Sequence, residues 1–325
     1  MLYIYIFVLF TIGIAVAIFY IQKTGKESQF VAIDQTLTTE HLLKKVRKME
    51  IKTKGLSKHI FSGDYQSAFK GRGMSFSEVR NYIYGDDVRN IDWNVTARTN
   101  ETAVKVFEEE RELTVILMVD VSGSSFFGTN GRFKSDLITE ISSVIAFSAS
   151  SNNDKVGAIL FADGVVKYLA PKKGKQPILR LIRELLAIDK TNQSTNLSTA
   201  LEYLNNIQKK RAIVFCLSDF MDKDFESALT VASRRHDIIG MHIYDTAEKT
   251  LPSAGLLNVL DPETGAQRTV DTSSSQVRDR YEASFKDHQD YVNTTFMKNG
   301  CDIVSISTDD DYVKKLLQFF KSKGR

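Results

Sequence analysis

The part of the chain after residue 112 alternates short apolar runs with longer segments of helical periodicity. The run LTVILMV at 113–119 is apolar throughout and rich in β-branched residues, which is typical of a fully buried strand. A long helical pattern at 132–150 follows it, and similar strand and helix segments then alternate to the end of the chain. Because parallel strands need crossover connections, this order predicts a doubly wound α/β domain whose mostly parallel sheet is covered on both faces.

The other predicted strands are short and rich in Val, Ile, Leu and Phe. An Asp-Gly pair at 163–164 predicts a tight turn between two of them, and DPETG at 261–265 predicts a second hairpin. These strands are expected at 155–161, 165–170, 212–218, 237–245 and 301–307.

The first 22 residues, MLYIYIFVLFTIGIAVAIFYIQ, carry no formally charged side chain. About 20 apolar residues are what a helix needs to span the hydrocarbon core, so this run predicts a transmembrane helix. Lys23 and Lys26 follow it directly, and the positive-inside bias then places the large domain in the cytoplasm, on a single-pass anchor in the inner membrane. A helix buried within a soluble domain is the alternative.

Four segments are therefore expected along the chain. The polar stretch after the anchor has the composition of a tether, and a short amphipathic helical pattern opens the next segment. The segments are an anchor at 1–22, a linker at 23–40, an N-terminal segment at 41–112 that contains GDDVRNIDW, and the α/β domain at 113–325.

The charge of the chain is almost balanced, with 43 Lys and Arg against 40 Asp and Glu, a net of +3. No global positive field attracts nucleic acid, so nucleic acid is not an expected partner. The two cysteines, Cys216 and Cys301, form no C-x-x-C or Cys/His pattern and lie in strand-like runs. This usage fits buried thiols in a reducing compartment.

Oxygen-bearing side chains cluster where the predicted strands end. Asp120, Ser122 and Ser124 follow the first strand of the domain, Asp219 follows a later strand, and Thr195 lies on a loop before a helix. In open α/β sheets the ligand site lies beyond the carboxyl ends of the strands, where the strand order reverses. Three hydroxyls and two carboxylates are hard donors, which favour Mg²⁺, Mn²⁺ or Ca²⁺.

Enzyme signatures do not match these residues. A serine-hydrolase elbow needs G-x-S-x-G, whereas Ser122 is flanked at that spacing by Asp120 and Ser124. The five histidines form no H-E-x-x-H pair. We therefore expect no catalysis. The alternative, a divalent-metal-dependent hydrolase that uses the same carboxylates, would need a general base and a substrate pocket.

The D-x-S-x-S pattern with a later Thr and Asp resembles the metal-ion-dependent adhesion site of von Willebrand factor type A domains. The resemblance implies that Ser122, Ser124 and Thr195 bind the ion directly. It also implies that Asp120 and Asp219 act largely through water and that one coordination position is left open for a carboxylate of the partner.

The stretch FKGRGMSFSEVRNYIYGDDVRNIDWNVTAR at 69–98 is similar to the hallmark of the bacterial family called domain of unknown function 58, in which a type A domain follows directly. Genes of this family commonly lie beside one for a MoxR-type AAA+ ATPase. The resemblance therefore implies a metal-dependent protein-protein interaction module with a chaperone-like or assembly role, and that ATPase as the partner that supplies an Asp or Glu. Phe126, Phe127, Phe220 and Met221 are apolar candidates for further contact, with packing against helices as the alternative.

The charged residues of Gly85–Trp93 have two interpretations. They form an internal ion-pair network around a turn, with Trp93 packed beneath. Alternatively they form an exposed docking surface with Arg80 and Arg89 as anchors, because arginine and tryptophan often dominate interfaces.

Overall fold

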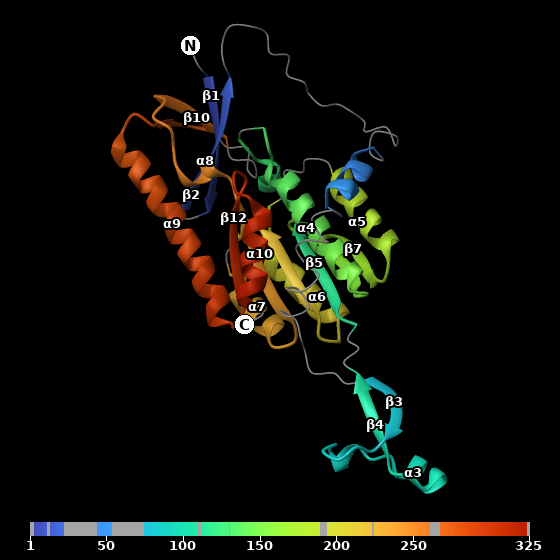
Figure 1. Ribbon diagram of the computed structural model, residues 1–325. Coiled ribbons are helices and arrows are strands. Elements are labelled where there is room, and N and C mark those ends of the chain that lie inside the picture. The colour runs from blue at the N-terminus through green and yellow to red at the C-terminus, as the bar shows by residue number, and fades with distance from the viewer. Residues whose placement is uncertain are drawn as a thin grey trace.

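The computed structural model describes residues 3–11, 14–22, 44–53, 75–108, 112–129, 131–188, 194–222, 224–260 and 267–323. Its centre is a six-stranded sheet in the order β12-β9-β8-β5-β6-β7 (Figure 1). Five strands are parallel and the edge strand β7 pairs antiparallel with β6. The bounds are β5 Thr114–Asp120, β6 Lys155–Phe161, β7 Val165–Lys172, β8 Ile213–Ser218, β9 Asp237–Tyr244 and β12 Asp302–Ser307. The predicted mostly parallel α/β sheet is confirmed.

Helices cover both faces of this sheet (Figure 1). In β5, Leu117 packs in the cluster with α4, α5 and α10, whereas its neighbours Ile116 and Met118 pack in the cluster with α6, α7 and α9. Successive side chains of a strand point to opposite faces, so a strand covered on both faces must be apolar throughout. The bounds are α4 Lys134–Ser151, α5 Lys175–Ala187, α6 Leu197–Ile207, α7 Glu226–Ser233, α9 Ser275–Lys298 and α10 Tyr312–Lys323.

The order of the strands reverses beside β5. From β5 the chain moves outward to β6 and β7, and it then returns through α6 to β8, on the other side of β5. The carboxyl ends of β5 and β8 therefore flank the reversal, which is where ligand sites form in sheets of this kind.

The N-terminal apolar run differs from the prediction. Instead of one helix over residues 1 to 22, the structure has the antiparallel strands β1 Tyr3–Thr11 and β2 Ile14–Gln22. The run is rich in Ile, Val, Phe and Tyr, which favour strands, and β1 finds a partner in β10. Within the described ranges, no helix has the length and apolar character that crossing a membrane requires.

A second sheet has the order β11-β10-β1-β2. Its strands β10 Leu256–Leu260 and β11 Gln267–Asp271 form the antiparallel hairpin that the sequence predicts, although the turn at 261–265 lies outside the described residues. The predicted linker at 23–40 also lies outside them. A helix over 44–53 packs on the main domain, where Val46 is buried and Lys52 pairs with Glu140.

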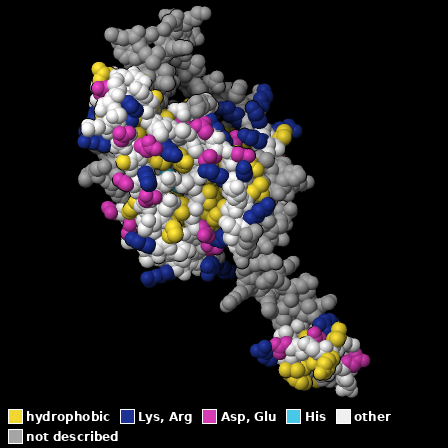
Figure 2. Space-filling view, turned by 60° about the vertical axis from the view of Figure 1, so that its left-hand side comes forward, with side chains coloured by type: hydrophobic (Ala, Val, Ile, Leu, Met, Phe, Trp, Pro, Cys, Tyr) yellow, Lys and Arg dark blue, Asp and Glu magenta, His cyan; other side chains and the backbone are white. Residues whose placement is uncertain are grey.

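A small unit precedes the main domain, and Figure 1 draws it apart from the large sheet. It contains the GDDVRNIDW motif, in which Asp86 pairs with Arg80 and Asp92 caps α3. These contacts agree with the ion-pair interpretation. Trp93, however, is 69% exposed rather than packed beneath the turn, and Figure 2 shows hydrophobic side chains gathered on this unit. The bounds are β3 Ser75–Asn81, η1 Val88–Asn90, α3 Trp93–Thr99 and β4 Ala103–Glu108.

Candidate functional site

The site begins at the carboxyl end of β5, where Asp120 is the last residue of the strand and is buried. Its Oδ1 accepts the main-chain N–H of Ser122 at 2.9 Å. Its Oδ2 accepts the hydroxyl of Ser218 at 2.5 Å and lies 3.5 Å from the hydroxyl of Thr195. All of these partners are neutral, so nothing among them balances the charge of the carboxylate.

The two serines lie on the turn that follows Asp120. Ser124 belongs to the short helix η2 Gly123–Phe126, and Ser122 immediately precedes that helix. Their hydroxyl oxygens are 3.1 Å apart, and both side chains are buried. The turn therefore brings two hydroxyl oxygens to one point beside the end of the strand.

Thr195 reaches the same point from the loop before α6. The adjacent main chain is fixed by the loops that follow β6 and β8, because Asn196 N–H donates to the carbonyl of Ala162 and Leu197 N–H donates to Asp222. Thr195 is only partly buried, so it marks the side on which the cluster approaches solvent.

Asp219 follows β8 and carries the second predicted carboxylate. Its Oδ2 accepts a hydrogen bond from the Lys134 ammonium at 2.8 Å, its Oδ1 accepts the N–H of Met221 at 3.3 Å, and the Ser124 hydroxyl also donates to it. Burial alone would raise the pKa of Asp219, but the charge and hydrogen bond of Lys134 outweigh burial, and the pKa is lowered.

Lys134 and Glu248 belong to the same buried cluster, and the sequence analysis missed both. Lys134 is the first residue of α4, and its ammonium also donates to Glu248 at 2.7 Å. Glu248 lies in α8, Thr246–Lys249, directly after β9. A cation at a helix N-terminus opposes the helix dipole, and that mismatch was the one available signal for Lys134. Ser218, also missed, immediately precedes Asp219.

The two predicted carboxylates repel each other across the site. Burial, and then the charge of Asp219, raise the pKa of Asp120 to about 6. Burial also raises the pKa of Glu248 to about 7, although the Lys134 charge opposes this shift. Burial is the larger cause of the raised pKa of Asp120, and the charge of Asp219 adds to it.

These donors fit a hard divalent cation. The structure brings all five predicted residues, Asp120, Ser122, Ser124, Thr195 and Asp219, together through direct contacts. Oxygen donors that include an unneutralised carboxylate suit Mg²⁺, Mn²⁺ or Ca²⁺. Among the described residues no three Asp, Glu, His or Cys side chains form a metal-binding group, so any ion here depends on the hydroxyls.

Two histidines lie under the site without facing it. His288 places Nε2 3.1 Å from the main-chain oxygen of Asp219, and His242 is buried beside it. Burial lowers the pKa of both rings. Within the described residues, neither ring forms a hydrogen bond with the hydroxyls of Ser122, Ser124 or Thr195. Neither histidine is therefore arranged as the general base of a hydrolase.

The four apolar candidates for partner contact divide into two kinds. Phe127 and Phe220 are buried, and Phe220 packs against Phe225 and Phe296 in the core. Phe126 and Met221 are partly exposed. Only these two remain as contact candidates at the rim.

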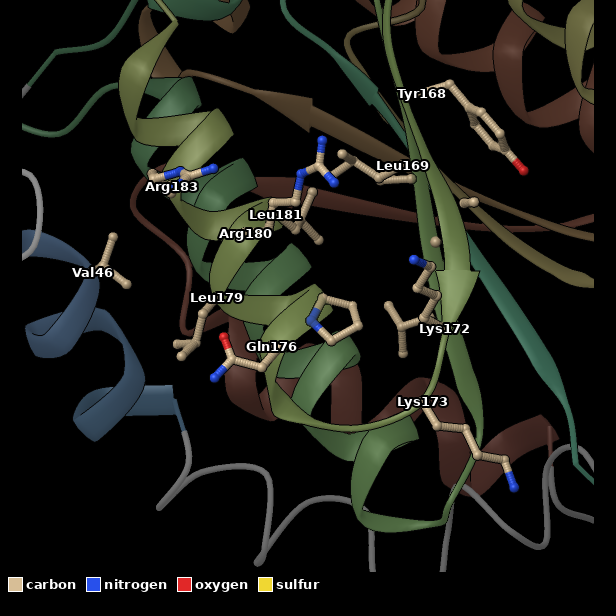
Figure 3. Close-up of a pocket in the computed structure, with 15 residues that line it drawn as sticks. Val46, Tyr168, Leu169, Lys172, Lys173, Gln176, Leu179, Arg180, Leu181 and Arg183 are labelled. Atoms are coloured by element: carbon tan, nitrogen blue, oxygen red, sulfur yellow. The ribbon is translucent and has the colours of Figure 1, made fainter.

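A groove of about 780 Å³ lies elsewhere, between α5 and the edge strand β7 (Figure 3). Leu169 and Leu181 contribute apolar surface, and Lys172, Lys173 and Arg180 contribute charge. None of the five predicted site residues lines this groove, so it is separate from the polar cluster at the ends of β5 and β8.

Residues 78–291 match the family described as "Protein of unknown function DUF58". An uncharacterized protein of Mycobacterium tuberculosis is 27% identical over 283 residues, which are 86% of this chain and 89% of the relative. The uncharacterized protein YeaD of Bacillus subtilis is 32% identical over 111 residues, 34% of this chain and 25% of that protein.

Two solved structures are similar at low sequence identity. The hypothetical protein BatB from Bacteroides thetaiotaomicron is 14% identical and has a TM-score of 0.40, and the match covers 65% of this chain and 98% of that one. The SpRpn10 VWA domain is 11% identical and has a TM-score of 0.35, and the match covers 64% of this chain and 95% of that one.

Proposed function

The chain belongs to the family of unknown function DUF58, and on that premise we propose that it is a metal-dependent protein-binding module of the von Willebrand factor type A kind. The observation that carries the proposal is the convergence of five oxygen-bearing side chains at the point where the strand order reverses. Binding is favoured over hydrolysis because the neighbouring histidines are buried beneath the donors.

In this proposal Ser122, Ser124 and Thr195 bind one Mg²⁺, Mn²⁺ or Ca²⁺ ion directly. Asp120 and Asp219 act on the ion largely through water molecules. The ion would supply positive charge and an open coordination position. An Asp or Glu of a partner protein fits such a position because hard dications prefer carboxylate oxygen. Because Thr195 is partly exposed, the partner would reach the ion from the side of this residue.

Calorimetric titration with Mg²⁺ tests the metal site. We expect the wild type to bind one ion and Asp120→Asn to lose binding, because the variant keeps the shape of the side chain and removes its charge. Asp163→Ala is the matched control, since Asp163 is an exposed carboxylate near Ser194 on the same edge and outside the donor set. Equal Mg²⁺ affinity in the wild type and Asp120→Asn would refute the site.

The proposed partner is a AAA+ ATPase of the MoxR type, with which the protein would act in a chaperone-like or assembly role. Co-purification of the two proteins tests this, repeated with chelator and with Thr195→Ala. We expect both treatments to abolish the contact. A complex that survives both would show that the donor cluster does not mediate it.

We also propose that the chain is attached to the cytoplasmic face of the inner membrane through residues 1–22. The support is the uncharged, apolar composition of that run and the lysines that follow it. Carbonate extraction should leave the full-length protein in the membrane pellet. Its release into the supernatant would reject the attachment and leave the strand pairing of β1 and β2 as the role of this run.

A further inference from the structure

Lys134 occupies an unusual place for a lysine. It begins an 18-residue helix, where the helix dipole disfavours positive charge, and its side chain is only 1% exposed. A buried ammonium is tolerated only when it is paired and hydrogen-bonded. Here Asp219 and Glu248 accept from it at 2.8 and 2.7 Å. The residue after β8, the helix α8 and the start of α4 are thus held together by one nitrogen atom.

Because of Lys134, the two carboxylates of the donor cluster, Asp219 and Asp120, differ in whether a positive charge contacts them. Asp219 is neutralised, because an ammonium contacts its Oδ2 while Met221 and Ser124 donate hydrogen bonds to the carboxylate. Among the described residues, the donors to Asp120 are neutral: the main-chain N–H of Ser122 and the hydroxyls of Thr195 and Ser218. An incoming cation therefore meets one carboxylate that still needs positive charge and one that already has it.

The formal charges of the buried cluster sum to a value that one dication balances. Asp120, Asp219 and Glu248 carry three negative charges when they are ionised, and Lys134 carries one positive charge, so the sum is −2. One dication balances this sum. Without the lysine the same cluster would carry −3, and the ion would be surrounded by excess negative charge that repels an acidic partner.

We propose that Lys134 is a positioning residue that keeps the Asp219 carboxylate from binding the metal ion directly. The proposal rests on the metal site proposed above. Because the ion then has one anionic ligand fewer, more of its positive charge remains for the carboxylate of a partner. The lysine thus sets the strength of the external contact, although it touches neither the partner nor the ion.

Terbium luminescence tests this role, because lifetimes in H₂O and D₂O count the water molecules bound to the ion. Lys134→Met leaves two buried carboxylates unpaired, and its fold is at risk. The main variant is therefore the double substitution Lys134→Met with Glu248→Gln, which frees Asp219 alone. Lys52→Met is the matched control, because Lys52 forms an ion pair with Glu140 of α4, a residue outside the donor set.

In the double variant we expect the bound Tb³⁺ to lose at least one water as Asp219 replaces it. Calorimetry should show the Mg²⁺ affinity rising about tenfold, since a carboxylate ligand is gained. The Lys52→Met control should match the wild type in both measurements. Equal water counts and Mg²⁺ affinities in the wild type and the double variant would overturn the role of Lys134. Absence of ion binding by the wild type would instead refute the metal site itself, and this inference with it.

Discussion

The buried histidine of β9 makes the stability of the main domain depend on acidity in a way that can be worked out. His242 is fully buried, its Nδ1 is 3.3 Å from the Ser305 hydroxyl, and its Nε2 has no hydrogen-bond partner within the described ranges. Burial, and then the neighbouring His288, lower the pKa of this ring from 6.5 to about 3. Protonation in the folded state is therefore strongly disfavoured.

The direction of the change in stability with pH follows from which state of the chain binds the proton. Below pH 6.5 the unfolded chain takes up a proton at His242 that the folded chain does not, so stability falls as the pH falls toward about 3. At about 1.36 kcal/mol per pH unit, the full gap corresponds to about 5 kcal/mol. The first part of it, from pH 6.5 to 5, corresponds to about 2 kcal/mol.

His242→Leu removes the titrating group, so the free energy of unfolding should fall less steeply with acid than in the wild type. Urea unfolding followed by circular dichroism at pH 7.5, 6.5, 5.5 and 4.5 measures the slope. Ser305→Ala is the control, because it removes the hydrogen-bond partner of the ring but keeps the titrating group, so the free energy of unfolding should still fall with acid. Identical acid slopes in the wild type and His242→Leu would refute the reasoning.

Three further outcomes are expected. Gly240→Ala should destabilise the main domain by about 1–3 kcal/mol in urea unfolding, because a Cβ there would lie 2.6 Å from the Phe296 ring, and adding Phe296→Leu should recover part of the loss. Ser218→Ala should cost about 1.5–3 kcal/mol without added metal, since it removes a buried hydrogen bond to a carboxylate; an unchanged urea midpoint would contradict this. Asp92→Ala removes the cap of α3 and should lower the thermal midpoint seen by Trp93 fluorescence, while the circular dichroism transition of the large sheet stays in place.

The predicted sheet and four of the five predicted donors, Asp120, Ser122, Ser124 and Asp219, follow from one physical rule. Strands covered on both faces must be apolar, so their ends can be found in the sequence, and parallel strands bring their carboxyl ends to one edge. A polar side chain directly after such a strand, like Asp120 or Asp219, is therefore placed without knowledge of side-chain contacts.

Other features depend on contacts that no local pattern encodes. Lys134 and Asp219 are 85 residues apart, and Lys134 and Glu248 are 114 apart, so the helical pattern around Lys134 cannot reveal either pairing. The N-terminal apolar run meets the length requirement of a spanning helix and equally the residue preferences of strands. In the structure its two halves pair with each other as strands, and β1 also pairs with β10, which lies about 250 residues away.

The neighbouring strands β9, β8 and β5 each lead to an aspartate at their carboxyl ends. These three aspartates differ in the groups that contact their carboxylates. Asp245, after β9, accepts the hydroxyls of Thr129 and Thr308 at 2.6 Å each, together with main-chain N–H groups. Asp219, after β8, accepts a hydrogen bond from the Lys134 ammonium. Asp120, at the end of β5, accepts from neutral donors within the described residues and is repelled by Asp219. Of these three aspartates, Asp219 is paired with a cation, whereas Asp120 combines neutral donors with the repulsion of Asp219 and lies beside the paired serine hydroxyls, which is where a cation would be stabilised most.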